Sequence, residues 1–223
     1  GLAGSLVVAT SLSVHALASD ELSSIAPLNG FIPVFTLFYA WIFLGEVPPV
    51  FGVFGVIIVF LGAYLISIKS TTSHWLEPLI HLFRHRAALI ALASTMFAAI
   101  NTVFIKAATN FNFDPLTILF TGVLGGALFT FPVLLKQKYR KQIQAGFKTP
   151  IPFLAAVISS LLGNYFHTLA TSMTYASYAI TVRRFDSIFA VLLGWRFLKE
   201  TNIRNKLIGA IVIVIGCGFL VLG

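Results

Sequence analysis

Charged side chains are scarce in this chain of 223 residues: Asp, Glu, Lys and Arg together make up 10%. A soluble domain carries about 25% charge, so this deficit excludes folding around one core surrounded by water. Hydrophobic residues supply 58% of the sequence, and the mean hydropathy is +0.94. Crossing a bilayer takes roughly 20 apolar residues, and the chain holds several such runs. The sequence therefore predicts an integral, multi-pass membrane protein, expected in a plasma or inner membrane.

Cysteine and the common catalytic signatures are also missing. Cys217 is the single cysteine, which excludes an intrachain disulfide. The chain has no Gly-x4-Gly-Lys-Ser/Thr loop for nucleotide phosphates. It also lacks His-Glu-x-x-His, paired membrane aspartates and Gly-x-Ser-x-Gly, the patterns typical of an intramembrane hydrolase. His81 and His85 lack a supporting carboxylate, so neither a metal site nor another cofactor is predicted.

The net charge of +8 reflects basic residues between the apolar runs. Twelve of the fifteen Lys and Arg are Arg196 and those in the connectors 69–86, 136–148 and 199–206. That placement is typical of the positive-inside bias of membrane proteins. We therefore expect a lipid bilayer as partner, not nucleic acid, and a homo-oligomer is also compatible with the sequence. The bias would place these connectors on the cytoplasmic side.

Eight apolar spans are predicted. They are Leu2–Ser19, Leu22–Leu44, Pro49–Ile68, Ala87–Ala108, Leu116–Leu135, Pro150–Ser172, Ala176–Leu198 and Lys206–Gly223. The second span is interrupted by Pro27, Asn29, Gly30 and Pro33, because proline removes a helix hydrogen bond and kinks the segment. Asp114 and Pro115 predict a capped helix start, and Trp75–Phe83 an amphipathic interfacial piece.

The chain contains one pattern twice. Ala16–Ile68 and Ala170–Leu222 match without gaps at a shift of 154, with 11 identities over 53 positions. Each copy has an apolar segment ending in an aromatic-rich turn closed by glutamate, followed by a glycine-bearing apolar segment. The copies begin five spans apart, an odd number, which predicts opposite orientations in the membrane. An inverted repeat of this kind is typical of duplicated transporters.

The residues of the repeat resemble the EamA-type half of the drug/metabolite transporter superfamily. They are Pro33–Val34–Phe35, Phe43–Leu44–Gly45–Glu46, Gly55 and Gly62 in the first copy, and Phe197–Leu198–Lys199–Glu200, Gly209 and Gly216 in the second. The resemblance implies ten helices in two inverted halves around a central site. The fold class expected is therefore all-α and polytopic, with eight transmembrane helices forming part of that ten-helix fold.

The expected division of the chain follows from the same resemblance. Residues 1–68 would be the last three helices of a first half, 69–86 a connector with an interfacial amphipathic segment, and 87–223 a five-helix second half. Because the first half has only three spans and the chain opens within apolar sequence, we expect two further helices upstream. The family pattern of cytoplasmic termini would put the 136–148 loop outside, opposite to the charge bias.

Seven polar residues within the spans are predicted to bind substrate. Arg183 and Arg184 are the strongest candidates, because guanidinium forks suit carboxylate or phosphate. The pair also resembles a Lys-Arg pair of the sugar-phosphate translocators, in which a sixth-helix lysine, here Lys106, completes the site. A structural ion pair with Asp186 and lysine snorkelling are the alternatives. The remaining candidates, for which packing or structural hydrogen bonds are alternatives, are Asn29, Asn101, Asn164 and His167.

A second set of residues is predicted to be structural. Glu46 and Glu200 would meet the positive N-terminus of the helix that follows each of them, with a coupling-ion role as the alternative. Gly55/Gly62 and Gly209/Gly216 recur at seven residues and would allow close helix approach; Pro33 would shape the broken span. Together these features favour a secondary transporter moving a small anionic metabolite by alternating access. An intramembrane enzyme and a channel-like or structural membrane protein are the alternatives.

Overall fold

The computed structural model describes residues 4–5, 7–9, 12, 26–67, 86–134, 150–186, 188–189 and 203–222. Every regular element in these ranges is a helix, which confirms the predicted all-helical class for this part of the chain. The elements are η1 (Ala26–Phe31), α3 (Ile32–Leu44), α4 (Val50–Ser67), α6 (Arg86–Asn110), α7 (Pro115–Leu134), α9 (Pro150–Met173), α10 (Ala176–Val182) and α12 (Ile203–Leu222). Glu200, the predicted interfacial piece and the 136–148 loop lie outside the described residues.

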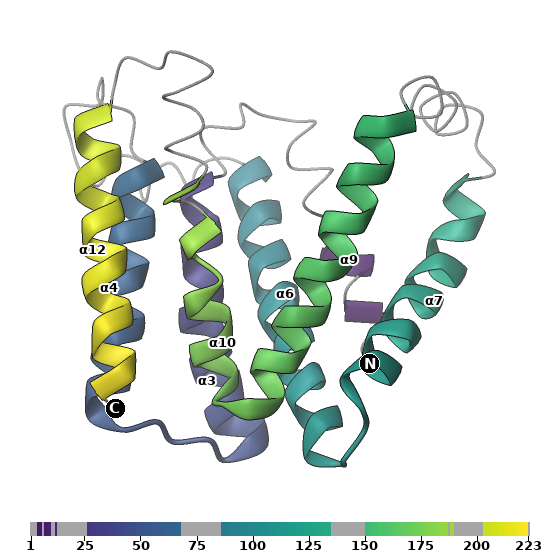
Figure 1. Ribbon diagram of the computed structural model, residues 1–223, viewed down its shortest axis with the longest axis horizontal. Coiled ribbons are helices and arrows are strands. Elements are labelled where there is room, and N and C mark those ends of the chain that lie inside the picture. Colours follow the sequence, from purple (N-terminus) through teal and green to yellow (C-terminus); the bar gives the residue numbers. More distant parts are fainter. Residues whose placement is uncertain are drawn as a thin grey trace.

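The helices stand roughly side by side in Figure 1. α12 and α4 form one edge, α3 and α10 lie next to them, and α9 and α7 form the opposite edge beyond α6. The connections 45–49, 111–114 and 174–175 all lie at one end, at the bottom of the view. We call this end the turn end.

The predicted break in the second span is confirmed. A 3-10 helix, η1, occupies Ala26–Phe31, and the α-helix begins only at Ile32, with Pro33 in its first turn. Proline suits this position because the first-turn N–H groups have no partner within the helix. The predicted cap of α7 is confirmed as well, because the Leu116 N–H donates to Asp114 Oδ2 at 3.0 Å.

The span predicted over Ala176–Leu198 is not one continuous helix. α10 ends at Val182, and a turn follows at Arg183 and Arg184. The Arg184 N–H bonds the Thr181 carbonyl at 2.9 Å, three residues back and not four. Such a bond tightens the last helical turn and ends the regular α-helix. The arginine pair therefore lies at a helix end.

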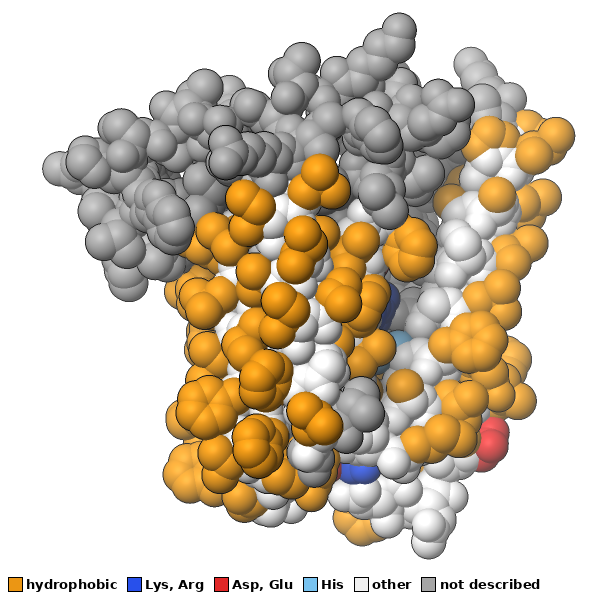
Figure 2. All heavy atoms as spheres, turned by 60° about the vertical axis from the view of Figure 1, so that its left-hand side comes forward, with side chains coloured by type: hydrophobic (Ala, Val, Ile, Leu, Met, Phe, Trp, Pro, Cys, Tyr) orange, Lys and Arg blue, Asp and Glu red, His pale blue; other side chains and the backbone are white. Residues whose placement is uncertain are grey.

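Small residues fill the interior of the bundle, and large apolar ones face outward. Phe43, Leu128 and Ile151 are 67%, 75% and 80% exposed, and Figure 2 shows hydrophobic side chains over the described surface. Buried positions are instead rich in alanine, threonine and serine. This is the reverse of a soluble protein and suits a bundle whose surroundings are lipid tails. Two described helices, Leu89–Asn110 and Pro150–Met173, are long and apolar enough to cross a bilayer, and four shorter apolar helices accompany them.

α4 and α12 pack through their glycines. A Cβ placed on Gly55 would lie 2.8 Å from the Gly216 carbonyl oxygen, and one placed on Gly62 would lie 2.8 Å from that of Gly209. As the residue number rises along α4, the residue number of its contact partner on α12 falls, so the two helices are antiparallel. Val59 and Ile213, both fully buried, fill the space between the two glycine contacts. The absence of side chains at these glycines gives the two helices room for this close approach.

A polar cavity between the helices

A cavity of about 480 Å³ lies between η1, α6, α7, α9 and the end of α10. Figure 2 shows basic and histidine atoms within a hollow between hydrophobic surfaces. Ile105, Ile118 and Ile180 supply part of its apolar wall. Six of the seven residues predicted to bind substrate line this cavity, and they come from four elements distant in sequence: Asn29, Asn101, Asn164, His167, Arg183 and Arg184.

The arginine pair lies at one wall of the cavity. Arg183 is exposed, whereas Arg184 is partly buried and its Nη1 donates to the Asn29 carbonyl at 3.5 Å. The buried Nε of Arg184 has no hydrogen-bond partner among the described residues. Asp186 also lines the cavity and lies close to Arg184 in sequence, so the wall carries charges of both signs with a positive excess.

α9 presents two predicted residues to the same space. Asn164 and His167 are one turn apart on one helix face, and both line the cavity. The His167 side chain is buried, and its Nδ1 lacks a partner within the described ranges. Leaving a buried polar group unpaired costs about 1–3 kcal/mol. Arg184 and His167 both line the cavity, so a ligand that reaches these two nitrogens would satisfy them.

The hydroxyl groups that line the cavity mostly donate a hydrogen bond to a backbone carbonyl of their own helix. Thr95 bonds the Leu92 carbonyl at 2.7 Å, and Thr168 bonds the Asn164 carbonyl at 2.9 Å. Such bonds to a carbonyl three or four residues back satisfy a hydroxyl inside a bundle. Their oxygens can still accept, but donation to an anion falls to the guanidinium, imidazole and asparagine amide groups of the lining.

The threonine and serine part of the lining was not predicted from the sequence. The residues concerned on α6 are Ser94, Thr95 and Thr102. The signal was available, because Ser94 and Asn101, and likewise Thr95 and Thr102, are seven residues apart and therefore share a helix face over two turns. Asn101 Nδ2 also donates to Ser5 Oγ at 3.1 Å, so this asparagine has a structural bond as well.

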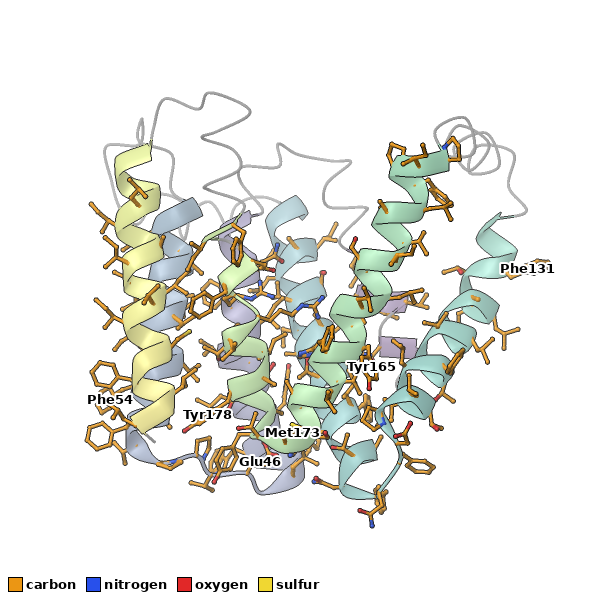
Figure 3. All side chains as sticks on the ribbon, viewed as in Figure 1. Glu46, Phe54, Phe131, Tyr165, Met173 and Tyr178 are labelled. Atoms are coloured by element: carbon orange, nitrogen blue, oxygen red, sulfur yellow. The ribbon has the colours of Figure 1, made fainter. Side chains whose placement is uncertain are left out.

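Lys106, the seventh predicted residue, is not among the residues lining the cavity. Its Nζ donates to the Thr171 and Thr174 carbonyls at 3.1 and 2.8 Å and lies 3.7 Å from Glu46 Oε1. Glu46 in turn accepts from the Ala176 N–H, through Oε2 at 3.0 Å. The partner predicted for Glu46 was the next helix in the chain, α4; its observed partner is the start of α10. Figure 3 places Glu46 at the turn end, beside the α9–α10 connection.

Two stretches of the chain, residues 1–68 and 85–222, match the sequence profile of the EamA-like transporter family. The chain belongs to this family. The resemblance found in the glutamate-closed repeat is thereby confirmed. Membership implies an integral membrane protein that acts as a membrane transporter rather than as an enzyme.

The pseudopaline exporter CntI from two strains of Pseudomonas aeruginosa is similar to this family member. Each sequence is 25% identical over 205 residues, which cover 91% of this chain and 67% of the exporter. The similarity therefore extends over most of the chain.

Proposed function

We propose that this EamA family member is a secondary transporter that moves a small anionic metabolite through the cavity by alternating access. One observation carries the proposal: the cavity collects two guanidinium groups and a buried histidine, and Arg184 Nε and His167 Nδ1 have no partner in the described part of the chain. A carboxylate or phosphate oxygen accepts charge-assisted hydrogen bonds from the guanidinium groups, and an imidazole N–H can add an uncharged one. The similarity to a pseudopaline exporter supports a metabolite as the cargo and export as the direction.

We further propose that the chain is built as an inverted repeat with eight spans, divided near residues 69–86. In the internal alignment Gly55 corresponds to Gly209, and Gly62 to Gly216. The contacts are crossed, because Gly55 meets Gly216 and Gly62 meets Gly209. Reciprocal contacts of this kind are expected when a two-fold axis relates two copies. Because α4 and α12 are antiparallel, a two-fold axis that relates them must be perpendicular to both helices. Such an axis supports opposite orientations of the two copies in the membrane.

The cavity supports the same relation. Asn29 and Gly30 of the first copy correspond to Arg183 and Arg184 of the second. These equivalent segments lie together, because Arg184 Nη1 reaches the Asn29 carbonyl and both residues line the cavity. The broken start of α3 and the broken end of α10 thus face one solute space. Interrupted helices at such a site free backbone groups for ligand binding.

Transport can be measured with the purified chain in proteoliposomes. Saturable uptake of labelled carboxylates and phosphates, accelerated by unlabelled solute inside, is expected for an exchanging carrier. Arg184→Gln removes a charge-assisted donor, so uptake of the preferred anion should fall by roughly 10- to 100-fold. Arg184→Lys, which keeps the charge without the planar fork, should give an intermediate loss. Asn110→Ala, on an exposed position of α6, is the matched control and should transport normally.

Three results would reject this assignment. Full uptake of every transported anion by Arg184→Gln would remove the guanidinium from the binding site. Flux that rises linearly with solute concentration and shows no exchange would indicate a pore and not a carrier. Hydrolysis or other turnover of the solute by the purified chain would favour the intramembrane enzyme instead.

A further inference from the structure

Three segments meet at the turn end around one pair of opposite charges. Lys106 of α6 bonds the Thr171 carbonyl in the last turn of α9 and the Thr174 carbonyl just after it, and Glu46 bonds the first N–H of α10, at Ala176. The two charged groups lie 3.7 Å apart, and their side chains are only 12% and 11% exposed. A lysine at a helix C-terminus and a carboxylate at an N-terminus both oppose the local backbone dipoles favourably.

This cluster lies directly beyond the cavity. Lys106 directly follows the lining residue Ile105, and Thr171 follows the lining residue Thr168 by three positions. Three helical residues span about 4.5 Å, so the cluster lies within one turn of the cavity wall, toward the turn end. Ala40, Val103 and Ala176 pack together at this level and are all buried. Small side chains allow the three backbones to approach closely at this end of the bundle.

The Glu46 carboxylate is held in place by its own turn. Gly45 adopts φ 65°, and the N–H groups of Gly45 and Glu46 bond the Trp41 and Ala40 carbonyls at 3.2 Å each. This left-handed cap ends α3 and directs the next residue across the bundle. The hydrogen bond between Glu46 and the Ala176 N–H joins the segment 1–68 to the segment 85–222, the two stretches that match the family profile.

A buried ion pair is an energetically costly way to hold together a contact that never separates. Replacing a buried ion pair by well-packed apolar residues is often neutral or stabilising. Charged groups do have an advantage where a contact must separate, because water can hydrate both partners once they part. An apolar seal of equal area would instead expose hydrophobic surface on opening.

We propose that Glu46 and Lys106 form a clamp that closes the transport pathway at the turn end, and that this end opens when both leave the helix ends that they now cap. The inference rests on the proposed alternating access between the two halves. It assigns these residues a positioning role and not contact with the solute.

Thiol accessibility tests the clamp without any need to know the solute. Ile105→Cys, in a Cys217→Ser background, places a reporter on the cavity wall beside Lys106. A membrane-impermeant methanethiosulfonate is added to right-side-out and to inverted vesicles carrying the full chain. With the clamp intact, the reporter should react from one side only. Glu46→Leu or Lys106→Met should raise labelling from the other side by about tenfold or more, the shift expected on losing a charged hydrogen bond.

The charge-swapped double variant Glu46→Lys with Lys106→Glu is the sharpest test. It preserves an ion pair but places an ammonium against the Ala176 N–H and a carboxylate against the Thr171 and Thr174 carbonyls. The clamp therefore predicts labelling at least as high as in the single variants. Restored closure would show that a simple ion pair suffices and would overturn the role of the helix ends.

Asp114→Asn is the matched control, because Asp114 is an acid at the same end whose bond stays within its own helix start. It should leave the labelling pattern unchanged. Folding is monitored in parallel variants that keep the buried Cys217 and lack the reporter, where Cys217 should stay unlabelled. Unchanged second-side labelling in folded Glu46→Leu and Lys106→Met would overturn the clamp, even if anion transport is observed. Increased labelling without transport of any solute would support the clamp and reject the proposed transport function.

Discussion

Gly216 on α12 has no room for a methyl group. A Cβ built there would lie 2.7 Å from Val59 Cγ2, 2.8 Å from the Val59 backbone nitrogen and 3.0 Å from the Gly55 carbonyl oxygen. Because two of these atoms are backbone atoms of α4, the clash cannot be relieved by rotating a side chain. Gly216→Ala must therefore push α4 and α12 apart along their whole contact.

The expected cost follows from two opposing terms. Inserting a methyl group into a packed interior costs about 1–3 kcal/mol. Replacing glycine by alanine within a helix returns about 0.5–1 kcal/mol. Gly216→Ala should therefore lower the free energy of unfolding by up to roughly 2.5 kcal/mol, and each kcal/mol should lower Tm by about 2–4 °C in a chain of this size.

Gly218, two residues further along α12, is the matched control. A Cβ at Gly218 meets nothing within 4 Å, so Gly218→Ala should gain the helix term without the clash and should leave Tm unchanged or slightly higher. Thermal unfolding in detergent, followed with a thiol-reactive dye that reports exposure of the buried Cys217, compares the two variants. Equal Tm values for both, or a higher value for Gly216→Ala, would refute the close packing of α4 against α12.

Three further substitutions have defined outcomes. Gly52→Ala would place a methyl group on the end of the buried Tyr178 ring, so it should lower Tm; adding Tyr178→Leu should recover part of the loss, and strictly additive effects would argue against the contact. Gly45→Ala should lower stability by about 1 kcal/mol because Gly45 has φ 65°; a denaturation midpoint equal to that of the unmodified chain would contradict this. Asp114→Ala should cost about 1 kcal/mol by removing the cap of α7, and amide exchange at Leu116 should be faster than in Asp114→Asn.

Most helix positions were predictable from local sequence. Apolar length, the Pro33 break and the Asp114–Pro115 start predicted elements that the structure confirms, because each depends on neighbouring residues alone. The end of α10 at Val182 was not predicted. This end depends on a tight backbone turn at two arginines. The apolar sequence around Val182 contains no proline, glycine or other residue that would have predicted the end of a helix there.

The candidate site was predictable as a set of residues but not as a set of contacts. Polar residues in apolar spans are costly, and this cost, together with the broken second span, selected Asn29, His167 and the arginine pair, all of which line one cavity. The resemblance to the sugar-phosphate translocators selected Lys106, which the structure places beside the cavity, against the end of α9. A lysine stem is long enough to reach any of several partners, so its sequence position did not determine its contact.

The sequence by itself determined membrane residence, the helical class and the family, because composition, periodicity and an internal repeat are properties of the chain. Only the tertiary structure decided that Gly55 meets Gly216 and that Glu46 reaches the start of α10. Those contacts join residues more than 120 positions apart, and their geometry depends on how whole helices pack. Backbone approach at glycine and the capping of one helix by a turn from another segment arise only when all the helices are in place.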